Sequence, residues 1–205
     1  MSLVNYATRE ITCKIVYYGP GRSGKTTNLH YIYGQVPEER RGKMVSLATQ
    51  TDRTLFFDFL PLDLGSISGF TTKFQLYTVP GQVYYQTTRR LVLQGADGVV
   101  FVADSQARQL DENIESFQDL HANLSDQGID PRVMPLVVQY NKQDLPTELI
   151  LPTAVLSDAI NFRDVPEFSA DALHGPGVFE TLRGISEIVL RRLSTGSSAA
   201  AAASK

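Results

Sequence analysis

The sequence predicts an α/β protein with a mostly parallel central sheet and helices on both faces. Three observations favour this fold class. Short, almost continuously apolar segments alternate along the chain with segments of helical periodicity, as in parallel sheets covered by helices. A glycine-rich loop lies between the first apolar segment and the first helix. Two further polar clusters follow later apolar segments, and ligands of such folds bind at the carboxyl ends of the strands.

The first elements surround the glycine-rich loop. Residues 1–8 form a short polar lead, and residues 9–18 are apolar enough for a strand that is buried on both faces. The helix expected over 25–34 ends near Gly34. Residues 35–53 are polar and lack periodicity, and a loop of this length in a compact domain is usually functional or mobile.

Two strands and a short helix come next. Residues 54–62 are rich in Phe and Leu, and residues 70–79 alternate between apolar and polar side chains. The connection over 63–69 contains two glycines, which is typical of a hairpin loop. We therefore expect an antiparallel pair at one edge of the sheet. The short helix covers 86–94 and ends at Gly95.

The second half of the chain continues the alternation. Residues 98–104 and 134–140 have the composition of buried strands. The helix between them, over 107–127, has an apolar residue at every third or fourth position and ends at Gly128. The remaining elements are a helix over 151–160, a short strand over 165–168 and a helix over 178–193.

Length and composition indicate one globular domain. The chain has 205 residues, of which 42% are apolar and 20% charged, and this is ordinary for a globular protein. We expect the domain to cover residues 1–193. Residues 194–205 are a low-complexity segment of Ser and Ala, expected to be a disordered tail that is either natural or a cloning scar.

Charge and cysteine content narrow the class of protein. The net charge is −3 with scattered Lys and Arg, which argues against a nucleic-acid partner. The single cysteine, Cys13, indicates a reducing compartment. No run of 18 apolar residues suggests a transmembrane helix, and no lipidation motif is visible. We therefore expect a cytoplasmic protein without a lipid anchor.

The glycine-rich loop fits the Walker A pattern, with a glycine, four residues and then Gly-Lys-Thr. Glycines let the backbone wrap closely around an anion, and the loop N–H groups and the helix N-terminus then point at the phosphates. Lys25 is expected to reach the β- and γ-phosphates, and the Thr26 hydroxyl to ligate Mg²⁺. The alternative is a glycine-rich turn that binds no ligand. The predicted phosphate-binding residues are Gly19, Gly21, Arg22, Ser23, Gly24, Lys25, Thr26 and Thr27, with the Arg22 side chain at the surface.

The tetrapeptide Asn141-Lys142-Gln143-Asp144 matches the Asn-Lys-x-Asp pattern that reads guanine. An ionised carboxylate only accepts hydrogen bonds, and guanine presents N1–H and its 2-amino group side by side. Asp144 is therefore expected to select guanine, because adenine would leave the carboxylate desolvated and unpaired. The alternative is a polar turn with no role in binding.

Neighbouring residues complete the expected base site. Lys142 can cover the plane of the base with its aliphatic stem, and Asn141 can brace its loop against the phosphate loop. Ser169 and Ala170, at the end of the next strand, are expected to add a backbone N–H toward the guanine O6.

The order and spacing of these motifs resemble the Ras-like small GTPases. Three segments narrow the resemblance: Lys14–Gly21, Asp52–Pro61 and Tyr77–Val83. Together they resemble the bacterial MglA family of Ras-like small GTPases, which act in cell polarity and gliding motility. The resemblance covers about residues 5–193. It implies a P-loop NTPase fold of the Ras-like G-domain type, with one antiparallel edge pair in an otherwise parallel sheet.

The resemblance also implies roles for single residues. Thr54 would sense the γ-phosphate and ligate Mg²⁺ together with Thr26, and Gly81 would join the nucleotide-binding set. Gln82 would orient the attacking water, and Arg53 would stabilise the charge that develops on the transferred phosphoryl group. Without the resemblance, Arg53 reads as a solvated loop charge.

One position departs from the wider Ras-like pattern. Ras-like proteins usually carry an acidic residue at the position of Thr78, where the carboxylate helps to hold the water shell of Mg²⁺. Because Thr78 is neutral, we expect weaker metal affinity, with Thr26, Thr54 and waters as the main support. Val83 also replaces a residue that is often acidic, and we assign no catalytic role to 83–85.

The primary hypothesis is a GTP-binding and GTP-hydrolysing switch that controls cell polarity and motility, by gliding or type IV pili, through effectors. The expected ligands are GTP, GDP and Mg²⁺. By resemblance, hydrolysis is slow alone, a roadblock-type MglB homodimer activates it, and the protein is recruited to a cell pole. The alternatives are a GTP-dependent scaffold with negligible hydrolysis and a P-loop ATPase or nucleotide kinase. A kinase would need an arginine-bearing lid segment, which the sequence does not offer.

Overall fold

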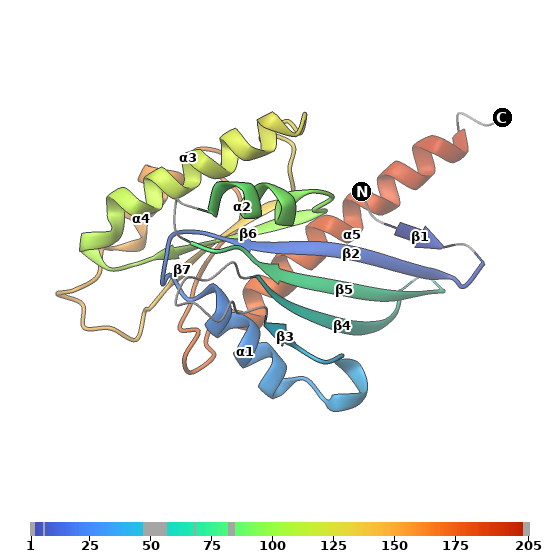
Figure 1. Ribbon diagram of the computed structural model, residues 1–205, viewed down its shortest axis with the longest axis horizontal. Helices are drawn as coiled ribbons and strands as arrows, with labels where there is room; N and C mark the ends of the chain where they lie inside the picture. Colours follow the sequence, from blue (N-terminus) through green and yellow to red (C-terminus); the bar gives the residue numbers. More distant parts are fainter. Residues whose placement is uncertain (1–2, 6, 47–56, 68, 82–84, 203–205) are drawn as a thin grey trace.

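The computed structural model describes residues 3–5, 7–46, 57–67, 69–81 and 85–202 (Figure 1). The strands are β1 (Leu3–Asn5), β2 (Glu10–Tyr18), β3 (Val45–Ser46), β4 (Asp58–Ile67), β5 (Phe70–Thr78), β6 (Gly98–Asp104), β7 (Leu136–Asn141) and β8 (Glu167–Ser169). The α-helices are α1 (Lys25–Gln35), α2 (Gln86–Leu93), α3 (Leu110–Asp126), α4 (Thr153–Ile160) and α5 (Val178–Ala202). Two short 3₁₀ helices, η1 (Glu38–Arg40) and η3 (Ala107–Gln109), complete the described elements.

The strands form one sheet in the order β3-β4-β5-β2-β6-β7-β8, with β1 paired to β2. The pairings β5–β2, β2–β6, β6–β7 and β7–β8 are parallel, and β4 is antiparallel to β5. The predicted mostly parallel sheet with an antiparallel pair toward one edge is therefore confirmed. Two short antiparallel strands, β1 on β2 and β3 on β4, were not predicted.

Helices cover both faces of the sheet and divide the core into two layers. One layer lies between the sheet and α2, α3 and α4, and the other lies between the sheet and α1 and α5. In Figure 1, α2 and α3 lie above the strands and α1 lies below them. Every residue of β6 is buried, as expected for a central parallel strand. Cys13 is also fully buried in β2, and burial raises the pKa of its thiol to about 12.

Two elements extend further than we expected. β4 continues to Ile67 instead of ending at 62, because a bulge between Asp63 and Ser66 lets the strand pass through Gly65, which has a φ of 83°. α5 continues to Ala202, so residues 194–202 of the segment that we expected to be disordered are helical. Alanine has the highest helix propensity of all residues, and a run of alanines therefore prolongs a helix that has already formed.

The topology brings the polar motifs to one edge of the sheet. β2, β5, β6, β7 and β8 are mutually parallel, so their carboxyl ends share that edge. The Walker A loop follows β2, and Asn141 is the last residue of β7. None of the described helices is long and apolar enough to cross a bilayer.

Candidate functional site

The phosphate loop, residues 19–26, joins the end of β2 to the start of α1. Gly24 precedes α1 with a φ of 100°, which L residues rarely adopt. A Cβ at this position would lie 2.1 Å from Nδ2 of Asn141. Backbone conformation and close packing therefore both require glycine here.

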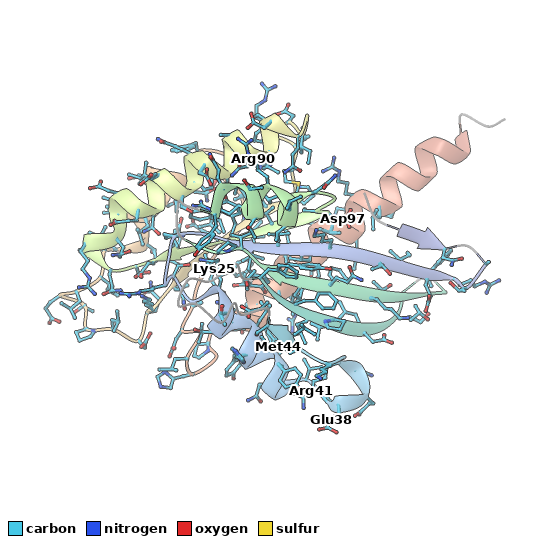
Figure 2. All side chains as sticks on the ribbon, viewed as in Figure 1. Lys25, Glu38, Arg41, Met44, Arg90 and Asp97 are labelled. Carbon is cyan, nitrogen blue, oxygen red and sulfur yellow. The ribbon has the colours of Figure 1, made fainter. Side chains whose placement is uncertain are left out.

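Lys25 is the first residue of α1 and the buried cation of the site (Figure 2). Its Nζ donates hydrogen bonds to the carbonyl oxygens of Gly19, at 2.9 Å, and Pro20, at 2.5 Å. Burial, together with the nearby charge of Arg89, lowers the pKa of Lys25 to about 7, while Asp58 opposes this shift. A polyphosphate would stabilise the charged form of this lysine, because it brings negative charge to a buried ammonium.

Asp58 is a buried carboxylate beside the phosphate loop that we did not predict as a site residue. Its Oδ2 accepts hydrogen bonds from the hydroxyls of Thr26, at 2.6 Å, and Thr78, at 2.9 Å. Its Oδ1 accepts a hydrogen bond from Ser46 at 2.7 Å. A carboxylate from the neighbouring strand β4 therefore lies directly against Thr26 and Thr78. The sequence signal that could have indicated Asp58 was its position as the single acidic residue in the apolar strand predicted over 54–62.

Asn141 connects the base motif to the phosphate loop, as we predicted. Its Nδ2 donates to the carbonyl of Ser23 at 2.8 Å, and its Oδ1 accepts from the N–H of Ala172 at 2.9 Å. The side chain is 3% exposed, so these hydrogen bonds are shielded from water. Asn141 thus joins three loops that follow β2, β7 and β8.

Lys142 lies over the same edge with a φ of 72°. Its Nζ forms an ion pair with Oδ2 of Asp104, at 2.5 Å. Asp104 is the buried last residue of β6 and is a second contributor that we did not predict. The ion pair holds the lysine ammonium against the end of β6. Asp144 is exposed two residues later, available to a ligand from solvent.

The loop after β8 differs from our prediction. The N–H of Ala170 donates to the carbonyl of Tyr140 at 2.8 Å, so it continues the β7–β8 ladder instead of pointing to a base. The carbonyl of Ala170 accepts from the N–H of Gln143 at 3.0 Å. Ser169 and Ala170 therefore support the loop of the base motif from behind. Parallel pairing to β7 uses the Ala170 N–H, one of the two backbone donors that we had considered for the guanine O6.

Gly81 lies directly against the phosphate loop. A Cβ on Gly81 would lie 2.4 Å from both N and Cα of Gly21, so the two backbones are in contact. Arg22 is exposed, as predicted, and Thr27 is half-buried on α1. The predicted residues Arg53, Thr54 and Gln82 lie outside the described residues.

Comparison with known proteins agrees with this geometry. The model of the ADP-ribosylation factor family matches residues 2–189. Over 196 residues the chain is 55% identical to the "Mutual gliding-motility protein MglA" of Myxococcus xanthus, covering 96% of this chain and 100% of that protein. It is 25% identical over 187 residues to ADP-ribosylation factor-like protein 6 of Caenorhabditis briggsae, and the match covers 88% of each chain. It is 24% identical over 178 residues to the protein of the same name from Caenorhabditis elegans, and the match covers 84% of each chain.

The sheet topology, the phosphate loop and the base motif all have the arrangement that the sequence resemblance implied. With the matches above, the chain belongs to the ADP-ribosylation factor family, as a GTP-binding switch of the MglA-like group of Ras-like small GTPases.

Proposed function

We propose that the protein is a GTP-hydrolysing switch that controls cell polarity and motility. The observation that carries the site assignment is the Asn141 side chain, which holds the base motif against the carbonyl of Ser23 in the phosphate loop at 2.8 Å. One nucleotide can therefore reach both motifs. The name of the 55% identical relative supports the cellular role.

Asp144 is the proposed reader of the base. Its exposed carboxylate can accept hydrogen bonds from guanine N1–H and the 2-amino group. Lys142, held by its ion pair with Asp104, covers the face of the base. Lys25 and the loop N–H groups take the phosphates.

Thr26 and Asp58 are the proposed protein support for Mg²⁺. The Thr26 hydroxyl and the Asp58 carboxylate lie 2.6 Å apart, and Mg²⁺ prefers such oxygen donors. The residues therefore fit the ion. When bound, Mg²⁺ neutralises charge on the β- and γ-phosphate oxygens. Our sequence-based expectation of weaker metal binding relied on Thr26, Thr54 and waters, and the proposal adds the Asp58 carboxylate to that set.

Gln82 and Arg53 are the proposed catalytic residues, and Thr54 is the proposed sensor of the γ-phosphate. These assignments rest on the sequence resemblance and on Gly81, which starts the Gln82 segment in contact with Gly21. Gln82 orients the attacking water and Arg53 stabilises the developing charge.

The proposed partners also follow from the resemblance. They are a roadblock-type MglB homodimer that accelerates hydrolysis and effectors of polarity or motility, with the protein in the cytoplasm and recruited to a cell pole. The competing function is a GTP-dependent scaffold that scarcely hydrolyses GTP. Single-turnover hydrolysis separates the two, because a scaffold needs only binding.

The base assignment predicts a change of nucleotide preference. Asp144→Asn should weaken GDP binding about tenfold or more and improve xanthosine diphosphate binding, because one acceptor becomes a donor. Affinities by calorimetry check this, with Asp111→Asn as a control on an exposed turn of α3. An unchanged preference for guanine in Asp144→Asn would remove the assignment.

The metal assignment predicts an altered requirement for Mg²⁺. Asp58→Asn should raise the Mg²⁺ concentration for half-maximal slowing of GDP release about tenfold, because a negative charge beside the ion is lost. The rate of GDP release in excess chelator should stay the same. Asp63→Asn, on the same strand β4, serves as the control. Equal Mg²⁺ midpoints for Asp58→Asn and the unmodified protein would contradict the role.

The pKa of Lys25 predicts proton uptake on nucleotide binding. Its pKa is about 7, and phosphates raise it by favouring the ammonium. Binding should therefore take up about 0.9 proton at pH 8 and about 0.1 at pH 6 from this group, and affinity should fall as the pH rises above 7. Calorimetry of GDP binding at pH 8 in buffers of different ionisation enthalpy measures the uptake. Lys25→Arg, which stays charged, should show none. Uptake that persists in Lys25→Arg would contradict the assignment to Lys25.

The catalytic assignment predicts a loss of turnover without a loss of binding. Gln82→Ala should slow single-turnover GTP hydrolysis roughly tenfold or more, because the attacking water is no longer oriented. The affinity for GTP should change little. Gln86→Ala, at the exposed start of α2, is the matched control. If Gln82→Ala hydrolyses GTP at the normal rate, Gln82 has no such role.

A further inference from the structure

A buried network of three polar side chains lies beneath the nucleotide site. Asn28 on α1 and Gln139 on β7 exchange two hydrogen bonds: Nδ2 of Asn28 donates to Oε1 of Gln139 at 2.8 Å, and Nε2 of Gln139 donates to Oδ1 of Asn28 at 3.0 Å. Nε2 of Gln139 also donates to Oγ1 of Thr181 on α5 at 2.9 Å. All three residues are 0% exposed. The network therefore links three elements that follow or carry the nucleotide-binding loops.

The first end of the network reaches the phosphate loop. Nδ2 of Asn28 donates to the carbonyl of Gly24 at 3.0 Å, and the backbone N–H of Asn28 donates to the same oxygen at 3.0 Å. The preceding carbonyl, of Ser23, accepts from Asn141. Two amide side chains thus hold adjacent peptide groups of the phosphate loop from below.

The second end reaches the loop that supports the base motif. The Thr181 hydroxyl donates to the carbonyl of Gly177 at 2.6 Å. Gly177 packs tightly on that loop, because a Cβ there would lie 2.0 Å from the carbonyl oxygen of Ser169 and 2.8 Å from Cα of Ala170. Gln139 itself lies two residues before Asn141 on β7, and both side chains therefore point to the same face of the sheet.

The fold alone does not require polar residues here. The elements that carry the network, α1, β7 and α5, also contribute residues such as Leu29, Val137 and Val178 to one apolar core layer. Replacing a satisfied polar network with apolar groups of the same shape can be nearly neutral for stability. Such a replacement would, however, remove the geometric constraint on the joined elements. Hydrogen bonds fix angles and distances, whereas apolar contacts leave them adjustable.

We propose that Asn28, Gln139 and Thr181 are positioning residues that set the separation between the phosphate loop and the base site. The proposal rests on the proposed function of this site. A nucleoside diphosphate engages both sites at once, so binding at one site raises the effective concentration of the ligand at the other. This gain in affinity depends on how well the two sites are held at the matching distance. A guanosine or a pyrophosphate engages one site and lacks this contribution.

The test compares ligands that span the two sites with ligands that occupy one. Competition against labelled GDP gives the affinities of GDP, guanosine and pyrophosphate. Thr181→Val removes the hydroxyl at nearly constant volume, and Thr181→Ser retains it. A triple variant, Asn28→Leu with Gln139→Met and Thr181→Val, replaces the whole network. Ser186→Ala, which removes a buried hydroxyl that bonds within α5, is the matched control.

We expect Thr181→Val and the triple variant to weaken GDP binding about tenfold while guanosine and pyrophosphate change by less than about twofold. Thr181→Ser and Ser186→Ala should retain the affinity of all three ligands. Unchanged GDP affinity in Thr181→Val, or an equal loss for all three ligands, would overturn the proposal. If the triple variant does not fold, the Thr181→Val and Thr181→Ser pair decides.

The result also separates this proposal from the function on which it rests. An unmodified protein that binds neither GDP nor guanosine would remove the nucleotide site altogether. An unmodified protein that binds both, with variants that behave identically, would remove only the positioning role.

Discussion

The hydrogen bonds of the Asn141 carboxamide are the constraint on which the nucleotide site depends. They join Ser23 to a strand end that lies 118 residues later in the chain. Each half of the site is a local motif, and this hydrogen bond joins the two halves. The parallel order β2-β6-β7 makes the junction possible, because it brings the ends of the first and last of these strands to one edge with a single strand between them. One buried side chain, Asn141, therefore connects the strand ends that carry the two motifs.

Charge in the site is balanced by groups from different strands. Lys25 provides a buried positive charge, and Asp58 from β4 provides a negative charge beside Thr26. Lys142 is paired with Asp104 from β6. These groups are partly or fully buried, where charges interact more strongly than in water.

Most of the fold could be predicted from the sequence because it is encoded in local patterns. The strand over 98–104 and the first residue of α1, Lys25, were predicted correctly from an apolar run and a glycine loop. β1 and β3 were missed because strands of two or three residues leave no periodicity.

The site was predicted less completely, for a different physical reason. The roles of Gly24, Lys25 and Asn141 follow from motifs, and the structure shows the close packing expected at Gly24 and the bracing hydrogen bond expected of Asn141. Asp58 reaches Thr26 only through the antiparallel pairing of β4 with β5, and this is a tertiary relationship. The error at Ala170 has the same origin, since the partner of its N–H is set by the pairing of β8 with β7.

The contact between Gly81 and Gly21 has a mechanical consequence. Because their backbones touch, the phosphate loop determines the position of Gly81, the residue that precedes Gln82. A displacement of the phosphate loop toward Gly81 would therefore move Gly81. In the same way, a methyl group on Gly81 would displace the loop. The phosphate loop and the segment that begins at Gly81 are thus mechanically coupled through this contact without a ligand.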